Sequence, residues 1–334
     1  MEEAIKVYRG KYLESTHTMH VAVVNTKGEL LYSYGNPDRP TFPRSSMKPF
    51  QAVPVLETGA ARAFHFADAD ISLICASHSG ESRHRERVLK IIDGIHLEEN
   101  HLQCGTHIPR DAESYKALIR NGGELTPVYS NCSGKHSGML TAVVHMNEDV
   151  NSYRELSHPH QQRILQAIED ICEYPKKNIE IGVDGCGVPV HRLPLRYTGL
   201  GYARLANPFM KQDEHSQTLN QICHAMMKHP EMVGGENRFD TDVMRAFKGK
   251  IVSKAGAEGV QCLGVVGEDL GIVVKIEDGN ARAVSAVALE VLKQLRIGDE
   301  AIYKELDHYV NTPVLNTRND QIGRITVQFE LVKH

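Results

Sequence analysis

The sequence lacks the features that would place it at a membrane or on nucleic acid. It has no apolar run long enough to cross a bilayer, and its start, Met1-Glu2-Glu3-Ala4, lacks the basic and apolar stretches of a signal peptide. Positive charge is not in excess either, because 38 Lys and Arg stand against 42 Asp and Glu, for a net charge of -4. These absences predict a cytoplasmic protein that binds neither membrane nor nucleic acid.

Cysteine pairs and nucleotide-binding motifs are also missing. The seven cysteines form an odd set without Cys-x-x-Cys spacing, which indicates free thiols or metal ligands rather than a disulfide framework. No P-loop and no strand-Gly-x-Gly-x-x-Gly-helix frame is present, so an organic cofactor is not expected. The glycines of Gly199-Leu200-Gly201 and Gly234-Gly235 are interpreted as parts of turns.

The order of β-prone and helix-prone segments predicts the fold class. With 334 residues, 41% of them hydrophobic, the chain can bury a large core, and we expect a single domain over residues 1–334. Strand patterns lie at both ends, over residues 21–25, 30–34, 251–254, 260–266, 271–276 and 325–331. The first two flank a hairpin signal in which Gly28 can supply a positive φ. Helical periodicity covers residues 86–93, 112–121, 138–146, 160–173, 216–228 and 281–295. This order predicts an α/β protein with a mainly antiparallel sheet from about residues 1–40 and 250–334, and a mostly helical middle over about 46–249 that forms a helical lobe.

The segment Arg44-Ser45-Ser46-Met47-Lys48-Pro49 contains the only Ser-x-x-Lys of the chain. At the start of a helix, Ser45 and Lys48 would share a face, so that the amine could deprotonate the hydroxyl. Pro49 and the apolar residues after it favour a helix start here. The positive end of that helix would also stabilise negative charge on oxygen during acyl transfer. The motif alone fixes only two positions, which chance can also produce, and it therefore remains a hypothesis.

Two later segments partly match the pattern of serine acyl-transferases that carry Ser-x-x-Lys. Ser77-His78-Ser79 stands where Ser-Asp-Asn is usual, and Ser253-Lys254-Ala255-Gly256 stands where Lys-Thr-Gly is usual. The first lacks the Asp and Asn, and the second has Ala255 in place of Thr or Ser. A penicillin-type pocket is therefore not expected.

Two glycine-containing segments carry cysteines that could bind a metal. Cys132 lies within residues 130–138, and Cys186 lies within residues 184–189. Two thiolates with a nitrogen from Lys135 or His136 would form a zinc site. On spacing alone His136 is the better nitrogen ligand, because a lysine must first lose its proton. The plain alternative is that Ser137 or Ser133 caps the helix that follows while Cys132 is a small buried residue.

Five segments together resemble the Rhizobium-type L-asparaginase family, in order and across nearly the whole chain. They are Arg44-Ser45-Ser46-Met47-Lys48-Pro49, Cys75-Ala76-Ser77-His78-Ser79-Gly80-Glu81, Ser130-Asn131-Cys132-Ser133-Gly134-Lys135-His136, Asp184-Gly185-Cys186-Gly187-Val188-Pro189 and Lys254-Ala255-Gly256-Ala257-Glu258-Gly259. The resemblance implies a serine β-lactamase-like fold, shared with the related glutaminases, and L-asparagine as the substrate.

The resemblance also implies a role for particular residues. The catalytic residues would form two serine-lysine pairs, Ser45 with Lys48 and Ser77 with Lys254. Zinc would be held by Cys132, Lys135 and Cys186, so that the family pattern places Lys135 rather than His136 on the metal. The candidates for holding the substrate are then Arg44, His136 and Asp184.

The expected reaction is hydrolysis of L-asparagine to L-aspartate and ammonia through an ester on Ser45, with Lys48 as the base and Ser77 as the alternative nucleophile. Zinc would be structural or would position the substrate, since a serine nucleophile makes zinc-bound hydroxide redundant. Two other functions stay open: a glutaminase or other amidohydrolase with the same pair, and a non-catalytic zinc-dependent protein that binds a small ligand. A homodimer is the default expectation for an enzyme of this size.

Overall fold

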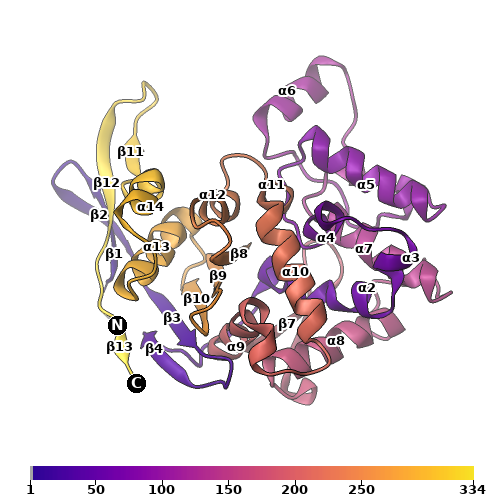
Figure 1. Cartoon of the computed structure of the whole chain (residues 1–334). Helices are drawn as coiled ribbons and strands as arrows, with labels where there is room; N and C mark the ends of the chain where they lie inside the picture. Colours follow the sequence, from indigo (N-terminus) through magenta and orange to yellow (C-terminus); the bar gives the residue numbers. More distant parts are fainter. Residues whose placement is uncertain (1–2) are drawn as a thin grey trace.

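The computed structural model describes residues 3–334 and divides into a side rich in strands and a side rich in helices. In Figure 1 the first and last strands of the chain, indigo and yellow, lie together on one side with both termini. The magenta helices of the middle of the chain lie on the other side (Figure 1). The two ends of the sequence therefore build one region, and the middle builds the other.

The central sheet is antiparallel and joins the N-terminal hairpin to the C-terminal strands. Its order is β13-β4-β3-β10-β9-β8, and Val21 in β3 is paired with Val274 in β10. Gly28 takes a φ of 82° in the turn between β3 and β4, as the hairpin prediction requires. The strands are β3 (Met19–Val24), β4 (Leu30–Tyr34), β8 (Ile251–Gly256), β9 (Val260–Val265), β10 (Leu270–Ile276) and β13 (Val332–Lys333).

Two smaller sheets complete the strand content. One has the order β11-β12-β1-β2 and the other β5-β7-β6, and both are antiparallel. The last strand was predicted over residues 325–331. The observed strand β12 lies earlier in the chain and ends at Val327. The strands are β1 (Ile5–Arg9), β2 (Tyr12–His17), β5 (Pro40–Thr41), β6 (Glu180–Val183), β7 (Pro189–Pro194), β11 (Pro313–Leu315) and β12 (Gln321–Val327).

Helices fill the middle of the chain and cover the central sheet. The α-helices are α1 (Lys48–Gln51), α2 (Val53–Glu57), α3 (Ala60–Ala63), α4 (Asp68–Ile74), α5 (Ser82–Gly94), α6 (Ala112–Arg120), α7 (Ser133–His145), α8 (Pro159–Cys172), α9 (Leu195–Ala206), α10 (Ser216–Lys228), α11 (Pro230–Val233), α12 (Phe239–Ala246), α13 (Val284–Gln294), α14 (Glu300–Glu305) and α15 (Asp307–Val310). The 3-10 turns are η1 (Arg44–Met47), η2 (Glu99–His101), η3 (Pro127–Tyr129), η4 (Lys176–Asn178), η5 (Pro208–Met210) and η6 (Ala281–Ala283). The predicted α/β class, with an antiparallel sheet from both ends of the chain and a helical lobe, is confirmed.

Helix α9 corrects one prediction, since Gly199 and Gly201 lie inside it rather than in a turn. The helix packs on β3, β9 and β10. A Cβ atom on Gly271 of β10 would stand only 1.9 Å from the carbonyl oxygen of Gly199. Glycine therefore serves here to bring a helix backbone against a sheet backbone, which a single-sequence pattern cannot distinguish from a turn signal.

The central sheet is buried on both faces. Along β3, Ala22 and Val24 belong to the core shared with the helical lobe, whereas Val21 and Val23 belong to the core under α13. This alternation follows from the two-residue period of a strand. It also explains why β3 and β9 are buried along their whole length, because each face of the sheet meets a layer of helices there.

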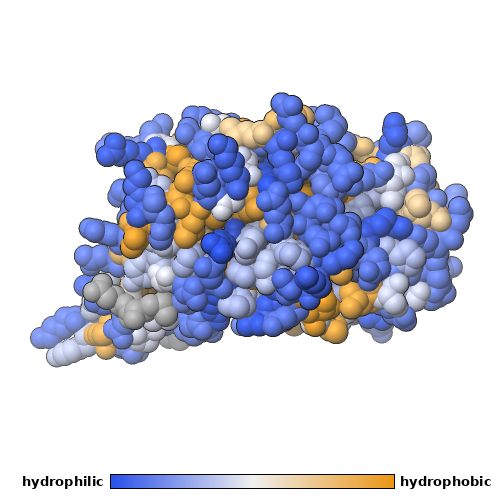
Figure 2. All heavy atoms as spheres, turned by 90° about the horizontal axis from the view of Figure 1, so that it is seen from below, coloured by the Kyte–Doolittle hydropathy of each residue, from blue (hydrophilic) through white to orange (hydrophobic). Residues whose placement is uncertain are grey.

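The surface is mixed in character. Seen from below in Figure 2, hydrophilic residues cover most of the face, and hydrophobic residues form separate patches. Within residues 3–334, no helix is both long and apolar enough to cross a membrane.

Candidate active site

The turn η1 holds Ser45 at the junction between the two regions. The Ser46 hydroxyl donates to the carbonyl of Pro43 at 2.6 Å, and the Tyr202 hydroxyl donates to the carbonyl of Ser46 at 2.6 Å. Ser45 is half-buried, and within residues 3–334 its hydroxyl has no hydrogen bond. Arg44, directly before it, has a φ of 55°, which is strained for a residue with a side chain. The predicted helix start is thus a fixed 3-10 turn that leads into α1.

Strand β8 reaches this turn because Gly256 has no side chain. A Cβ atom at Gly256 would stand 2.2 Å from the carbonyl oxygen of Pro43. Any other residue would force the strand away from η1. The close approach brings Lys254, which belongs to a distant part of the chain, toward Ser45.

Ser45 and Ser77 line one cavity of about 350 Å³ between the helical lobe and β8. The same cavity is lined by polar and charged side chains that include Arg110, Asn131, Asn237, Arg238, Asp240 and Glu258. A cavity of this size with hydroxyl, cationic and anionic groups on its wall suits a small polar ligand.

Lys48 is fully buried and contacts several oxygen atoms and the Cys132 thiol, whose charge opposes the effect of burial on the Lys48 pKa. Its amine donates to the carbonyl of Ala76, to the Ser77 hydroxyl at 3.0 Å and to the carbonyl of Asn131 at 3.5 Å. Burial lowers the pKa of Lys48, because the charged amine has lost its water. The sequence paired Lys48 with Ser45, whereas the structure places its amine on Ser77.

Lys254 is also fully buried, but a carboxylate accompanies it. Its amine donates to the carbonyl of Ala255 at 2.8 Å and lies 3.7 Å from Oδ2 of Asp240. Burial lowers the pKa of Lys254 to about 8, and the nearby charge of Asp240 opposes this shift. In the part of the chain that the structure describes, no hydrogen bond joins Lys254 to Ser77.

The three residues expected to bind zinc lie together. Nζ of Lys135 is 3.1 Å from Sγ of Cys186, and the Cys186 thiol shares a hydrogen bond with Cys132. That hydrogen bond lowers the pKa of Cys132 well below its ordinary value, although burial works against it. The pKa of Lys135 is raised, because the two cysteines and Asp184 outweigh the effect of burial. Helix α7 begins at Ser133, earlier than the residue 138 that the periodicity indicated, so Lys135 and His136 lie on this helix.

The donor set fits zinc. Ligand atoms 2.0–2.3 Å from a tetrahedral ion are roughly 3.5 Å apart, and the Lys135-Cys186 separation of 3.1 Å is close to that spacing. A thiolate is the form of cysteine that binds metal, and the low pKa of Cys132 favours it. The pKa values of Cys186 and Lys135 are raised, so zinc would have to displace a proton from each of these two ligands. Oδ2 of Asp184 lies 3.9 Å from Sγ of Cys186, where it could orient the metal ligands without itself binding the metal.

The candidates for holding substrate are engaged elsewhere and are not among the residues that line the cavity. Nε of Arg44 donates to Oδ1 of Asp184 at 2.7 Å. His136 is fully buried, with its Nδ1 2.6 Å from the hydroxyl of Tyr153. Arg44 and Asp184 instead connect the thiol cluster to the residue that precedes Ser45.

The structure adds two residues that the sequence did not indicate, Arg110 and Arg238. Both line the cavity, and within residues 3–334 neither guanidinium makes a hydrogen bond or an ion pair. Burial lowers the pKa of Arg110, and the positive charge of Arg238 adds to that shift. Asp240 and Glu258 line the same cavity, but among the described residues neither arginine has an ion pair with a carboxylate, so the two guanidiniums can bind an anion. No sequence signal marks them, because they are far apart in the chain and belong to no motif.

Comparison with protein families matches residues 5–327 to the model of L-asparaginase II. No curated protein matches the chain. Among solved structures, Mglu in its tris and glutamate form aligns with a TM-score of 0.40 and 14% identity over 84% of this chain and 61% of that one, which is less than two thirds of its length. D-alanine carboxypeptidase AmpC from Burkholderia cenocepacia aligns with a TM-score of 0.39 and 15% identity over 86% of this chain and 93% of that one.

Proposed function

The chain belongs to the L-asparaginase II family, and from this we propose that it hydrolyses the side-chain amide of L-asparagine to L-aspartate and ammonia. The observation that carries the proposal is that Ser45 and Ser77 share one cavity, with the Lys48 amine 3.0 Å from the Ser77 hydroxyl. A hydroxyl nucleophile and a desolvated amine are the groups that amide cleavage through an acyl-enzyme requires.

Ser45 is the proposed nucleophile, because its hydroxyl faces the cavity without a hydrogen bond within residues 3–334. Its oxygen forms an ester with the side-chain carbonyl carbon while the C–N bond breaks. The Ser45 proton passes through the Ser77 hydroxyl to neutral Lys48, and the same route returns it to the leaving nitrogen as ammonia. Water then attacks the ester, restores Ser45 and releases aspartate.

Lys254 has a different part in the proposal, because Asp240 supports its charged form. The amines of Lys48 and Lys254 are both buried, so it is unfavourable for both to be protonated at the same time. The charge of Lys48 accordingly lowers the pKa of Lys254. If Lys254 holds the shared proton, Lys48 is left neutral and able to act as the base.

Arg110 and Arg238 are the proposed partners of the substrate α-carboxylate. Both line the cavity that contains Ser45, and within the described residues both guanidiniums lack a protein partner. Glu258 lines the same cavity and is the acidic group available for the α-ammonium, since Asp240 is occupied by Lys254. This arrangement would select an amino-acid amide over a simple amide.

Cys132, Lys135 and Cys186 are the residues that would hold zinc. When bound, the ion would supply positive charge and rigidity beside the cavity. The contact from Cys186 through Asp184 to Arg44 is the path by which this cluster reaches Ser45. The zinc site would then fix the conformation of η1.

The test is a side-by-side assay of ammonia release from L-asparagine and L-glutamine by wild-type protein, Ser45→Ala and Ser77→Ala. We expect turnover of asparagine by wild type, and trapping of one aspartyl group on Ser45 in rapidly quenched samples analysed by mass spectrometry. Trapping on Ser77 would reverse the two serines. Equal turnover by wild type and Ser45→Ala would overturn the proposal, and faster turnover of glutamine would change the substrate.

A further inference from the structure

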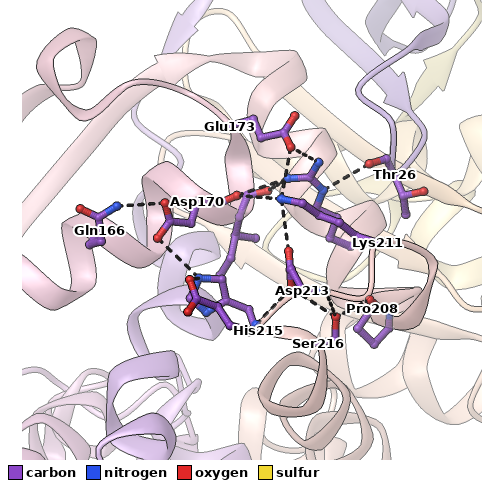
Figure 3. A network of polar contacts seen from close by, with 12 residues as sticks. Thr26, Gln166, Asp170, Glu173, Pro208, Lys211, Asp213, His215 and Ser216 are labelled. Atoms are coloured by element: carbon purple, nitrogen blue, oxygen red, sulfur yellow. Dashed lines mark hydrogen bonds and ion pairs between the residues drawn. The ribbon is translucent and has the colours of Figure 1, made fainter.

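A second group of possible metal ligands lies away from the cavity, at Asp170, Glu214 and His215. Among residues 3–334, the ligand atoms of these three side chains all lie within 4.8 Å of one another. Nε2 of His215 is 3.6 Å from Oδ2 of Asp170 and 4.0 Å from Oε1 of Glu214. Figure 3 shows the His215 ring directed toward Asp170.

Nε2 of His215 is a buried nitrogen without a hydrogen-bond partner. The residue is only 5% exposed, and its backbone is fixed because it precedes α10 and its amide donates to Oδ1 of Asp213 at 3.0 Å. A buried ring nitrogen without a partner costs free energy unless something binds it. The nitrogen faces two carboxylates, so its partner is expected to be positively charged. Glu57, Asp213 and Asp170 raise the pKa of His215, so a metal ion would compete with a proton for Nε2.

The neighbours of this group orient it as the outer ligands of a metal site do. Nδ1 of His215 is 2.8 Å from Oε1 of Glu57, an arrangement in which the ring donates its proton to the carboxylate and leaves Nε2 free to bind a metal. Gln166 donates to Oδ1 of Asp170 at 2.9 Å, which leaves Oδ2 of Asp170 for the same purpose. Glu57 and Gln166 are thus positioning residues for the two inner ligands.

The nearby cations do not neutralise the two ligand carboxylates. Arg204 forms an ion pair with Glu173 at 2.6 Å, and Lys211 forms ion pairs with Glu173 and Asp213, each at 3.2 Å. The part of Asp170 that both cations contact is its backbone carbonyl oxygen and not its carboxylate, as Figure 3 shows for Lys211. Within residues 3–334, neither Asp170 nor Glu214 has an ion pair with Lys or Arg.

From these observations we infer that Asp170, Glu214 and His215 bind a first-row divalent cation, independently of the zinc proposed for the thiol cluster. Two carboxylates and one imidazole suit ions such as Mn²⁺ or Zn²⁺, with water at the remaining positions. The ion would tie the end of α8 to the segment that precedes α10, with Glu57 of α2 bracing the histidine. The bound ion would therefore stabilise the packing of α8, α10 and α2 within the helical lobe.

The test uses Mn²⁺, because a hard ion binds carboxylates and imidazole better than it binds thiolates. Bound and free Mn²⁺ are distinguished by electron paramagnetic resonance during titration of the metal-free full chain. We expect one bound Mn²⁺ per wild-type chain. Glu214→Gln should weaken binding at least tenfold without affecting folding, since the Glu214 side chain is 82% exposed. Asp170→Asn should do the same, and Glu57→Gln should weaken it about tenfold to a hundredfold.

Two control variants separate this site from other parts of the molecule. His229→Gln removes a histidine that faces one glutamate, Glu231, and it should bind Mn²⁺ as wild type does. Cys186→Ala should also bind Mn²⁺ normally, so that failure of the thiol cluster cannot be mistaken for failure of this site. The inference is wrong if wild-type protein binds no Mn²⁺, as expected if a proton on Nε2 satisfies both carboxylates. Unchanged binding by Glu214→Gln and Asp170→Asn would also overturn it.

Discussion

Lys48 and Lys254 are two fully buried lysines beside one cavity, and they differ in what surrounds the amine. Around Lys48 the partners are carbonyl oxygens, the Ser77 hydroxyl and the Cys132 thiol, whereas Lys254 has the carboxylate of Asp240 at 3.7 Å. The carboxylate beside Lys254 stabilises the charged amine, while the charge that Cys132 offers to Lys48 is shared with Lys135.

The difference assigns two roles to one residue type. The surroundings of Lys48 suit an amine that gains and loses a proton, since burial lowers its pKa and a hydroxyl lies in contact. The surroundings of Lys254 suit an amine that holds a charge, and Asp240 is itself fixed by Ser253 and Gln261. A lysine in a Ser-x-x-Lys motif and a lysine on a late strand are therefore not interchangeable bases.

The largest effect is expected from Lys48→Met. Removal of the general base should reduce kcat for ammonia release from asparagine by about 10²- to 10⁴-fold, the range that proton transfer by a positioned side chain contributes. Lys275→Met is the matched control for kcat, since Lys275 is also buried and donates to carbonyl oxygens but touches no serine; because one of these carbonyls belongs to Glu258, its removal should raise KM rather than lower kcat. Comparable loss of kcat in both variants would show that burial, rather than the contact with Ser77, is what activity needs.

Asp240→Asn tests the ion pair between Asp240 and Lys254. It leaves the charged form of Lys254 without its carboxylate, and breaking a buried ion pair costs about 3–5 kcal/mol of folding free energy. Urea unfolding measures this loss. Asp242→Asn, on the same helix but hydrogen-bonded to the Tyr309 hydroxyl, should lose only about 1 kcal/mol. Equal losses would mean that Asp240 does not stabilise Lys254.

The pH dependence of stability tests the lowered pKa of Lys254. The pKa of Lys254 is about 8 in the folded chain and 10.5 as the ordinary value, so between these values the unfolded chain binds more protons. Lys254 therefore makes the folded state more stable as pH rises from 8 to 10.5, and less stable as pH falls back. Urea midpoints across this range should rise more for wild type than for Lys254→Met. Parallel curves would contradict the lowered pKa.

The smallest effect is expected from Ser253→Ala. It removes the hydroxyl that donates to Oδ1 of Asp240 at 2.7 Å, at a cost of about 1.5–3 kcal/mol of folding free energy, typical of a hydrogen bond to a charged group. Because the carboxylate keeps its charge, ammonia release should stay within about threefold of wild type. If ammonia release fell as much as it does in Lys48→Met, the hydrogen bonds around Asp240 and Lys254 would be needed for catalysis and not only for stability.

Local patterns predicted much of the fold. Helix α10 has the bounds that its periodicity indicates, residues 216–228, and the hairpin of β3 and β4 surrounds Gly28 as expected. Such features depend on neighbours in sequence, which a pattern can read. The strands β1 and β2 were not predicted, and the glycines of α9 were misread, because their meaning comes from segments far away in the chain.

The proximity of the predicted site residues could be inferred from the sequence, but their contacts could not, and their roles stay predictions. Motifs indicated that Ser45, Ser77 and the thiol cluster lie together, and the structure brings Ser45 and Ser77 to one cavity and Cys132 to the Lys48 amine. The sequence could not tell that the Lys48 amine turns to Ser77, since that depends on where the carbonyls of Ala76 and Asn131 lie. Arg110 and Arg238 were missed for the same reason, because only the folded chain makes them neighbours.

The pairing of β3 with β10 has a consequence for how the protein is made. These strands come from opposite ends of the chain, so β3 remains an open sheet edge while the ribosome is still producing the helical middle. Ser45 emerges early, but the strand that carries Lys254 and the strand that covers β3 emerge late, and such distant pairings form slowly. A nascent chain stopped before residue 270 would expose the apolar edge of β3 and be prone to aggregate. The cavity therefore comes into existence only at the end of synthesis, when the last quarter of the chain closes over the first.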